Sequence, residues 1–355
     1  MSAPLVTPPR RIAVLRALHL GDLLLAVPAL RALRAGFPGA EITLIGLPWA
    51  EAFARRFDRY LDRFVPFEGY PGIAEVQIDP ARTARFVAAQ RAAGYDLVIQ
   101  LHGSGRTSNA CALALGGRVT AGYYDGARPA GLDIGAPYPD DCSEIERNLR
   151  LARLLGCPDL GPALEFPLSA ADRAEAAALL DRLLPGGPLV GIHPGARYPA
   201  RRWPPERFAA AGDLLAERFG ARIVLTGSTE EVATVQQVAA AMRAAPLVLA
   251  GRTSLGGLAA LIARLDFFIS NDTGPAHIAD ALGTPSVTLF GPADPIRWAP
   301  LDRERHPVVR VPVACSPCAH RECPIDHRCL HRITPEMVAA AAMRLLGAGA
   351  IACGD

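Results

Sequence analysis

Runs of residues typical of buried strands alternate along this chain with segments that carry the apolar spacing of helices. In the first half each strand-like run precedes a helical segment: 11–16 and 22–35, 41–46 and 49–57, 96–103 and 107–115. A second series has strand-like runs at 189–195, 222–227, 266–270 and 286–291. This rhythm is typical of a parallel sheet with helices on both faces, so we predict an α/β fold.

The two series are separated by a stretch rich in proline and glycine between residues 156 and 167. A chain of 355 residues has room for two domains of about 150 residues each. The predicted parts are two Rossmann-like, doubly wound domains, 1–168 and 169–333, and a C-terminal helix within 334–355. We expect the carboxyl edges of both sheets to face one cleft.

The charge composition argues against a nucleic-acid partner. The chain has 37 basic and 35 acidic residues, a formal net charge of +2, and no lysine. A generic nucleic-acid binder needs a broad basic face, which this balance does not favour. Every cationic contact must therefore come from an arginine or a protonated histidine.

The chain has no apolar run of the roughly 18 residues that a membrane span needs, and its first residues lack a signal-peptide core. We therefore expect a cytoplasmic protein whose only membrane contact is peripheral, at the inner surface. Four scattered cysteines, Cys111, Cys142, Cys157 and Cys353, fit reduced thiols in that compartment.

The segment 270–292 has the form of an anion site. A strand at 267–269 leads through Asp272, Thr273 and Gly274 into a helix at 276–282, with Pro275 at its first position and His277 in its first turn. The free N–H groups and positive dipole end of such a helix favour a phosphate or diphosphate. The alternative is an ordinary strand-to-helix turn with a Thr or Asp cap.

Loops after two strands of the first domain also carry polar side chains. His19 and Asp22 follow the first strand, and His102 and Arg106 follow the strand that ends near residue 101. Asp22 is either a helix cap or a general base that takes a proton from a sugar hydroxyl. Arg106 is either solvated or bound to an acidic acceptor.

Two loops of the second domain carry further candidates. Arg201 and Arg202 precede Trp203 and can bind a diphosphate, whereas the tryptophan is expected to pack in the core. Glu231 follows another strand, where an acid can hold ribose hydroxyls or favour the helix dipole.

Six segments of the chain, in this order, resemble the heptosyltransferases of glycosyltransferase family 9. They are LGDLLLAVPALRALR, DLVIQLHG, ERNLRL, GIHPGA with RRW, LTGSTEE and SNDTGPAHIADALGTPSVTLFGPADP. The resemblance implies a GT-B fold and an inverting transfer of a sugar, usually heptose, from an ADP-linked donor, with no cofactor required. The implied acceptor is a hydroxyl of an acidic glycan or glycolipid, such as the lipopolysaccharide inner core.

The resemblance also implies roles for single residues. Asp22 matches the general base. The residues that the resemblance matches to the donor are Arg201, Glu231, Asp272, Thr273, Gly274 and His277, and it matches Arg106 to the acceptor. From their loop positions we also assign Arg202 to the donor and His19 and His102 to the acceptor. Arg201 stands where many members have a lysine, and the hydroxyl residues that some members carry after GIHPGA are absent here.

Four cysteines cluster near the C-terminus, at Cys315, Cys318, Cys323 and Cys329. Their spacing suits a structural zinc site, and packed free thiols or disulfides are the alternatives. In none of these cases do we expect the cluster to take part in sugar transfer.

Two other functions stay open at this point. A nucleotide-sugar epimerase of the same fold would need no acceptor, and a non-catalytic, zinc-stapled binding or scaffold protein would use Asp22 only as a cap. Fold alone does not separate these functions.

Overall fold

The computed structural model describes residues 7–181, 183 and 186–352. The chain divides into two compact units, Met1–Ala163 and Leu164–Asp355. The boundary predicted from the sequence lies after residue 168. Residues 1–6 and Cys353 lie outside the described residues. The expectation that the first residues lack a signal-peptide core falls partly on this stretch.

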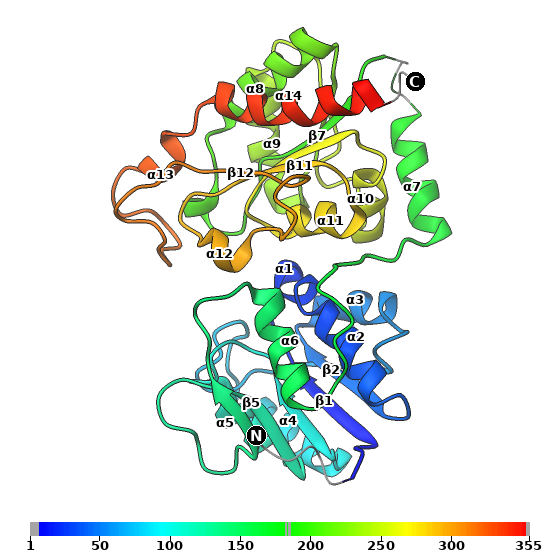
Figure 1. Ribbon diagram of the computed structural model, residues 1–355, viewed down its shortest axis with the longest axis vertical. Helices are drawn as coiled ribbons and strands as arrows, with labels where there is room; N and C mark the ends of the chain where they lie inside the picture. The colour runs from blue at the N-terminus through cyan, green and yellow to red at the C-terminus, as the bar shows by residue number, and fades with distance from the viewer. Residues whose placement is uncertain (1–6, 182, 184–185, 353–355) are drawn as a thin grey trace. The chain divides into compact units, whose positions relative to one another are not determined.

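The first unit holds a six-stranded sheet in which the paired strands run parallel (Figure 1). Its strands are β1 (Arg11–Leu15), β2 (Glu41–Gly46), β3 (Arg63–Pro66), β4 (Leu97–Gln100), β5 (Val119–Tyr124) and β6 (Ile134–Pro137). The order β3-β2-β1-β4-β5-β6 reverses direction between β1 and β4. In such sheets ligands bind outside the carboxyl ends of the two strands at this switch point.

The helices of the first unit follow the predicted rhythm with one correction. They are α1 (Leu20–Leu24), α2 (Val27–Gly36), α3 (Glu51–Arg56), α4 (Pro80–Ala93), α5 (Ser108–Ala114) and α6 (Glu144–Leu154), with a 3₁₀ turn at Pro48–Ala50. The prediction of a single helix over 22–35 is wrong, because the chain forms α1 and α2 instead. Pro28 cannot donate a backbone hydrogen bond and its ring conflicts with the carbonyl of Leu24, where α1 ends.

The second unit repeats the same topology. Its strands are β7 (Leu189–His193), β8 (Arg222–Leu225), β9 (Leu247–Val248), β10 (Phe267–Asn271), β11 (Ser286–Leu289) and β12 (Val308–Val309). Their order is β12-β11-β10-β7-β8-β9, again all parallel, so the switch point lies between β7 and β10. The predicted α/β class with two parallel sheets is confirmed.

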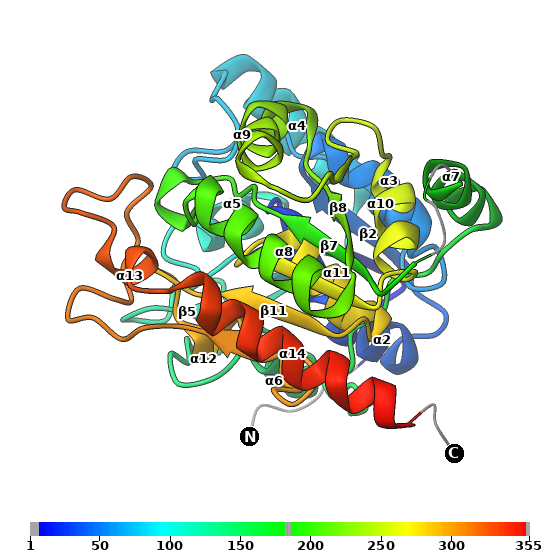
Figure 2. The ribbon, with the colours of Figure 1, turned by 90° about the horizontal axis from the view of Figure 1, so that it is seen from above.

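Helices cover both faces of this second sheet. They are α7 (Ala170–Leu180), α8 (Pro205–Phe219), α9 (Val232–Ala241), α10 (Leu255–Ile262), α11 (Gly274–Leu282), α12 (Pro295–Trp298), α13 (Arg328–His331) and α14 (Pro335–Ala352), with 3₁₀ turns at Pro199–Arg201 and Thr229–Glu231. The C-terminal helix α14 lies beside α8 in both views (Figures 1 and 2). No helix in the described part of the chain is long and apolar enough to cross a membrane.

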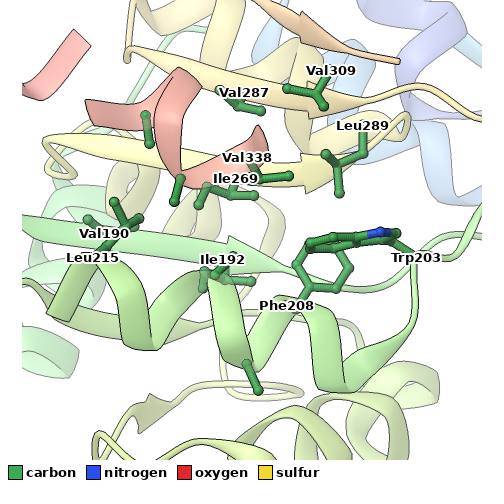
Figure 3. Packing of buried hydrophobic residues seen from close by; sticks show 14 of the residues in the cluster. Val190, Ile192, Trp203, Phe208, Leu215, Ile269, Val287, Leu289, Val309 and Val338 are labelled. Atoms are coloured by element: carbon green, nitrogen blue, oxygen red, sulfur yellow. The ribbon is translucent and has the colours of Figure 1, made fainter. Parts of the chain in front are cut away.

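The core of the second unit lies between β7, β10, β11 and the helices α8 and α14 (Figure 3). Trp203 is fully buried in it and meets the ring of Phe208 edge to face, with centroids 4.9 Å apart. The prediction that this tryptophan packs in the core is therefore confirmed. Its backbone and ring nitrogens also anchor the loop that carries the two candidate arginines, as described below.

Candidate functional site

Asp22 lies in the third position of α1, just beyond the carboxyl end of β1. Its Oδ2 accepts a hydrogen bond from the backbone N–H of His19 at 3.3 Å, which makes it part of a capping box. The side chain is only partly buried. Asp22 is therefore not the N-cap residue, which is His19, but the third helical residue of the capping box, and it keeps partial access to solvent.

His102 follows β4 at the switch point of the first sheet and is almost fully buried. Its Nε2 lies 3.7 Å from Oε2 of Glu75, and this histidine holds the pKa of Glu75 below its usual range, with a smaller contribution from His19. The three side chains therefore form one electrostatic group at this edge. Sequence reasoning missed Glu75, because it lies in a loop without a recognisable motif.

The contacts that the structure describes for Arg106 are with Asp125 and not with that group. Its guanidinium is exposed and donates to Asp125, with Nε 3.1 Å from Oδ2. An exposed ion pair of this kind is weak, so an acidic ligand can exchange for Asp125 at small cost.

Arg201 and Asp272 meet at the carboxyl edge of the second sheet. Nη1 of Arg201 donates to Oδ2 of Asp272 at 3.0 Å, and the carboxylate is 5 % exposed. His277 lies close to this pair: burial, aided by the Arg201 charge, lowers its pKa to about 4. At neutral pH the imidazole is therefore uncharged, and its buried Nδ1 has no hydrogen-bond partner among the described residues.

Helix α11 begins at Gly274, so Pro275 is its second residue and not its first as predicted, and Thr273 is its N-cap. The Thr273 side chain makes no capping hydrogen bond, so the ordinary Thr cap we had considered is not formed. Gly274 at the first helical position carries no side chain next to its own N–H, whereas Pro275 has no N–H and the Ala276 N–H donates to the Thr273 carbonyl at 3.0 Å. A helix of nine residues with this terminus suits an anion.

Asn271, the last residue of β10, ties the neighbouring loop to this edge. Its Oδ1 accepts from the backbone N–H of Trp203 at 3.1 Å, and its Nδ2 donates to the carbonyls of Pro194 and Gly195 at 2.8 and 3.2 Å. The ring nitrogen of Trp203 donates to the Ile333 carbonyl at 3.2 Å. Asn271 was not predicted as a site residue, although it stands inside the predicted motif.

Arg202 and Glu231 are held by the protein itself. Nε of Arg202 donates to the Ala196 carbonyl at 2.8 Å, so only the rest of its guanidinium is available to a ligand. Oε2 of Glu231 accepts the Ser228 backbone N–H at 2.8 Å and lies 3.5 Å from Nε2 of His193. His193 was not predicted either.

The four clustered cysteines line one cavity of about 60 Å³, together with Ala200, Pro292 and neighbouring residues. All four are free thiols. Within the described ranges, no three His, Cys, Asp or Glu side chains are placed so that they could hold a metal ion. As placed, the residues therefore do not form the predicted zinc site. Cys315 and Cys318 are exposed, Cys323 is partly exposed and only Cys329 is buried, so the alternative of packed thiols describes Cys329 alone.

This cysteine segment is tied to the turn that carries Arg201. The backbone N–H of Ala200 donates to the Arg321 carbonyl at 3.0 Å, and the N–H of Cys318 donates to the Pro292 carbonyl at 2.8 Å. The segment therefore supports the loop next to the candidate anion site.

Comparison with known proteins agrees with this geometry. A profile of glycosyltransferase family 9 (heptosyltransferase) matches residues 83–328. The chain belongs to this family. Lipooligosaccharide heptosyltransferase 2 of Campylobacter jejuni is a family 9 relative, 29% identical over 165 residues, which are 45% of this chain and 52% of the relative. This match thus spans about half the length of the relative.

Longer matches extend over most of this family 9 chain. Lipopolysaccharide heptosyltransferase 2 of Salmonella typhimurium is 26% identical over 312 residues, 83% of this chain and 86% of the relative. The structure of Escherichia coli ADP-heptose lipopolysaccharide heptosyltransferase II superimposes with a TM-score of 0.74 at 25% identity, covering 96% of this chain and 99% of that one. The predicted family and its GT-B fold are therefore confirmed.

Proposed function

We propose that this chain is a glycosyltransferase that moves a heptose from an ADP-linked donor to a hydroxyl of a glycan or glycolipid, with inversion at the anomeric carbon. The names of the family 9 relatives, which specify ADP-heptose and lipopolysaccharide, support this choice of donor and acceptor. The observation that carries the proposal is the group formed by Arg201, Asp272 and His277 beside the N-terminus of α11.

The second unit holds the donor in this proposal. The diphosphate lies at the N-terminus of α11, where the backbone N–H groups of Thr273 and Gly274 bind it and Arg201 and Arg202 supply positive charge. His277 is neutral at physiological pH and therefore contributes a hydrogen bond rather than a charge. Glu231 accepts from ribose hydroxyls of the nucleotide.

The first unit supplies the base and the acceptor contacts. Asp22 takes the proton of the acceptor hydroxyl. His19, His102 and Arg106 bind the acceptor, and Oε2 of Glu75 lies 3.7 Å from Nε2 of His102 beside them. Because such an acceptor is carried by a lipid in lipopolysaccharide, we expect peripheral contact with the membrane surface.

The proposed step is a single displacement. The acceptor oxygen loses its proton to Asp22 and forms a bond to the anomeric carbon, while the bond from that carbon to the diphosphate oxygen breaks. The electron pair of that bond leaves with ADP. The arginines and the helix terminus stabilise the charge that develops on the leaving group, so the charge that a metal supplies in other transferases comes here from the protein.

The test is release of ADP from ADP-heptose by the purified chain, with and without a deacylated inner-core acceptor. A transferase releases ADP at a rate that depends on the acceptor. An epimerase changes the sugar without acceptor, and a non-catalytic binding protein releases ADP no faster than the background. Either of the last two results would overturn the proposal.

A further inference from the structure

His193 is a buried histidine that the proposed chemistry does not use. It is the last residue of β7, 3 % exposed, at the switch point of the second sheet. Nδ1 lies 3.1 Å from Oγ1 of Thr226, and Nε2 lies 3.5 Å from Oε2 of Glu231. The imidazole thus bridges a buried hydroxyl and the carboxylate proposed to bind the ribose.

The network assigns the tautomer of this ring. A carboxylate only accepts hydrogen bonds, so the nitrogen that faces Glu231 must carry the proton, and Nδ1 must accept from the Thr226 hydroxyl. The Ile192 carbonyl, 3.4 Å from Oγ1, is the more distant acceptor for that hydroxyl. Burial lowers the pKa of His193, which keeps the ring neutral with a single N–H.

Two further neighbours, Ser228 and Gly195, restrict the position of the Glu231 carboxylate. The Ser228 N–H donates to the same Oε2 at 2.8 Å. Its other oxygen, Oε1, lies over Gly195, where a Cβ atom would come within 2.0 Å of it. Oε2 is therefore held by the protein, and the absence of a side chain at position 195 makes room for Oε1.

We infer that His193 is a positioning residue for the nucleotide site: with Thr226 and Gly195 it fixes the Glu231 carboxylate so that Oε1 accepts from a ribose hydroxyl. This inference rests on the proposed function, because it takes Glu231 as the ribose contact. His193 thereby contributes to the specificity of the donor site, because the positioned carboxylate selects nucleotides that carry the ribose hydroxyls.

A matched control exists in the same unit. His306 is 2 % exposed, with Nδ1 2.9 Å from Oγ of Ser286 and Nε2 3.7 Å from Oδ1 of Asp280. It has the same hydroxyl–imidazole–carboxylate arrangement. Ser286 begins β11, so this second triad lies at the opposite, amino edge of the sheet from the donor site.

The experiment measures binding of ADP, 2′-deoxy-ADP and 3′-deoxy-ADP to the full chain by calorimetry. We expect the wild type to bind ADP about tenfold more tightly than at least one deoxy analogue, as for one hydrogen bond to a charged group. Glu231→Ala should remove that preference and define the baseline. His193→Leu and Gly195→Ala should reduce it to about threefold or less, with little change in the affinity for the deoxy analogue, whereas His306→Leu should keep it.

Further variants keep the inference falsifiable if His193→Leu does not fold. Thr226→Val removes only the hydroxyl that sets the tautomer and should lower the preference, while its control Ser286→Ala should not. His193→Gln restores a donor and should recover part of the preference. If Glu231→Ala loses the preference but His193→Leu or Thr226→Val keeps it, the inference is wrong. If the wild type shows no preference or no ADP binding, both the inference and the proposed donor site are wrong.

Discussion

Nη1 of Arg201 lies 3.0 Å from Oδ2 of Asp272, a carboxylate that is 5 % exposed. A carboxylate this deeply buried is charged at acceptable cost only when a cation and hydrogen-bond donors compensate it. Arg201 itself is about one-third exposed, at 32 %, so its remaining N–H groups can reach a ligand. One arginine can therefore balance Asp272 and contact an incoming diphosphate.

Substitutions of Arg201 test this double role. Arg201→Ala removes the cation from Asp272 and from the ligand, so we expect ADP affinity to fall about 30-fold or more and stability to fall by roughly 1–3 kcal/mol. Arg201→Lys keeps the charge and should cost less than about tenfold in affinity. Calorimetry and urea unfolding measure the two effects. Unchanged ADP affinity in Arg201→Ala would remove this residue from the donor site.

The variant Asp22→Asn distinguishes the capping role of this carboxylate from its proposed role as the base. Asparagine keeps an acceptor oxygen for the His19 N–H, so the unfolding free energy should change by less than about 1 kcal/mol. It cannot take a proton, so kcat should fall about 100-fold or more with ADP affinity unchanged. Steady-state turnover with calorimetry distinguishes the roles. Near-normal turnover would leave Asp22 as a cap only.

Much of the fold followed from the sequence because parallel strands buried on both faces form apolar runs between turn residues. The strands β3, β5, β6, β9 and β12 were not predicted. Of these, β9 and β12 have two residues each, and pairing with a neighbour rather than composition defines them. The break between α1 and α2 could have been predicted from Pro28.

The candidate site was predicted only where a motif marks it. Arg201, Asp272 and His277 lie together because their loops follow the adjacent strands β7 and β10. Glu75 and His193 were missed for a different reason. Their importance depends on contacts with residues far away in the chain, which a single sequence does not show, although His193 stands inside the segment GIHPGA that resembles the family.

Asp280 gives a pH prediction. Burial raises its pKa to about 6, so its neutral form is favoured in the fold, and the stability it confers is full below pH 4 and is lost as the pH rises through 6. Asp280→Asn cannot ionise. The unfolding free energy of the variant minus that of the wild type should therefore increase by about 1–3 kcal/mol between pH 4.5 and 7.5.

Urea unfolding at both pH values measures this difference. Histidines that do not contact Asp280 are present in both proteins, so their effect cancels. His306, whose Nε2 lies 3.7 Å from Asp280, is removed from both proteins by His306→Leu. A difference that stays constant or decreases with pH would mean that Asp280 is ionised throughout this range.

The arrangement of the four cysteines around their cavity leads to a prediction about metal content and thiol reactivity. With the thiols placed as they are, we expect well under one metal ion per purified chain by elemental analysis. The exposed Cys315 and Cys318 should react with a thiol reagent in the folded chain, whereas Cys329 should react only after denaturation. We expect Cys318→Ser to lower stability more than the rate per folded molecule. About one zinc per chain, lost together with the folding of the segment after Pro312 on chelation, would instead establish the zinc site.

The product of the reaction tests the central proposal most directly. The purified chain is incubated with ADP-heptose and a deacylated inner-core acceptor, and the product is analysed by mass spectrometry and by NMR of the new anomeric centre. We predict one added heptose per acceptor, with anomeric configuration opposite to that of the donor, and one ADP released per transfer. Retention of configuration, or no heptose on any inner-core acceptor while another nucleotide-sugar is consumed, would contradict the account.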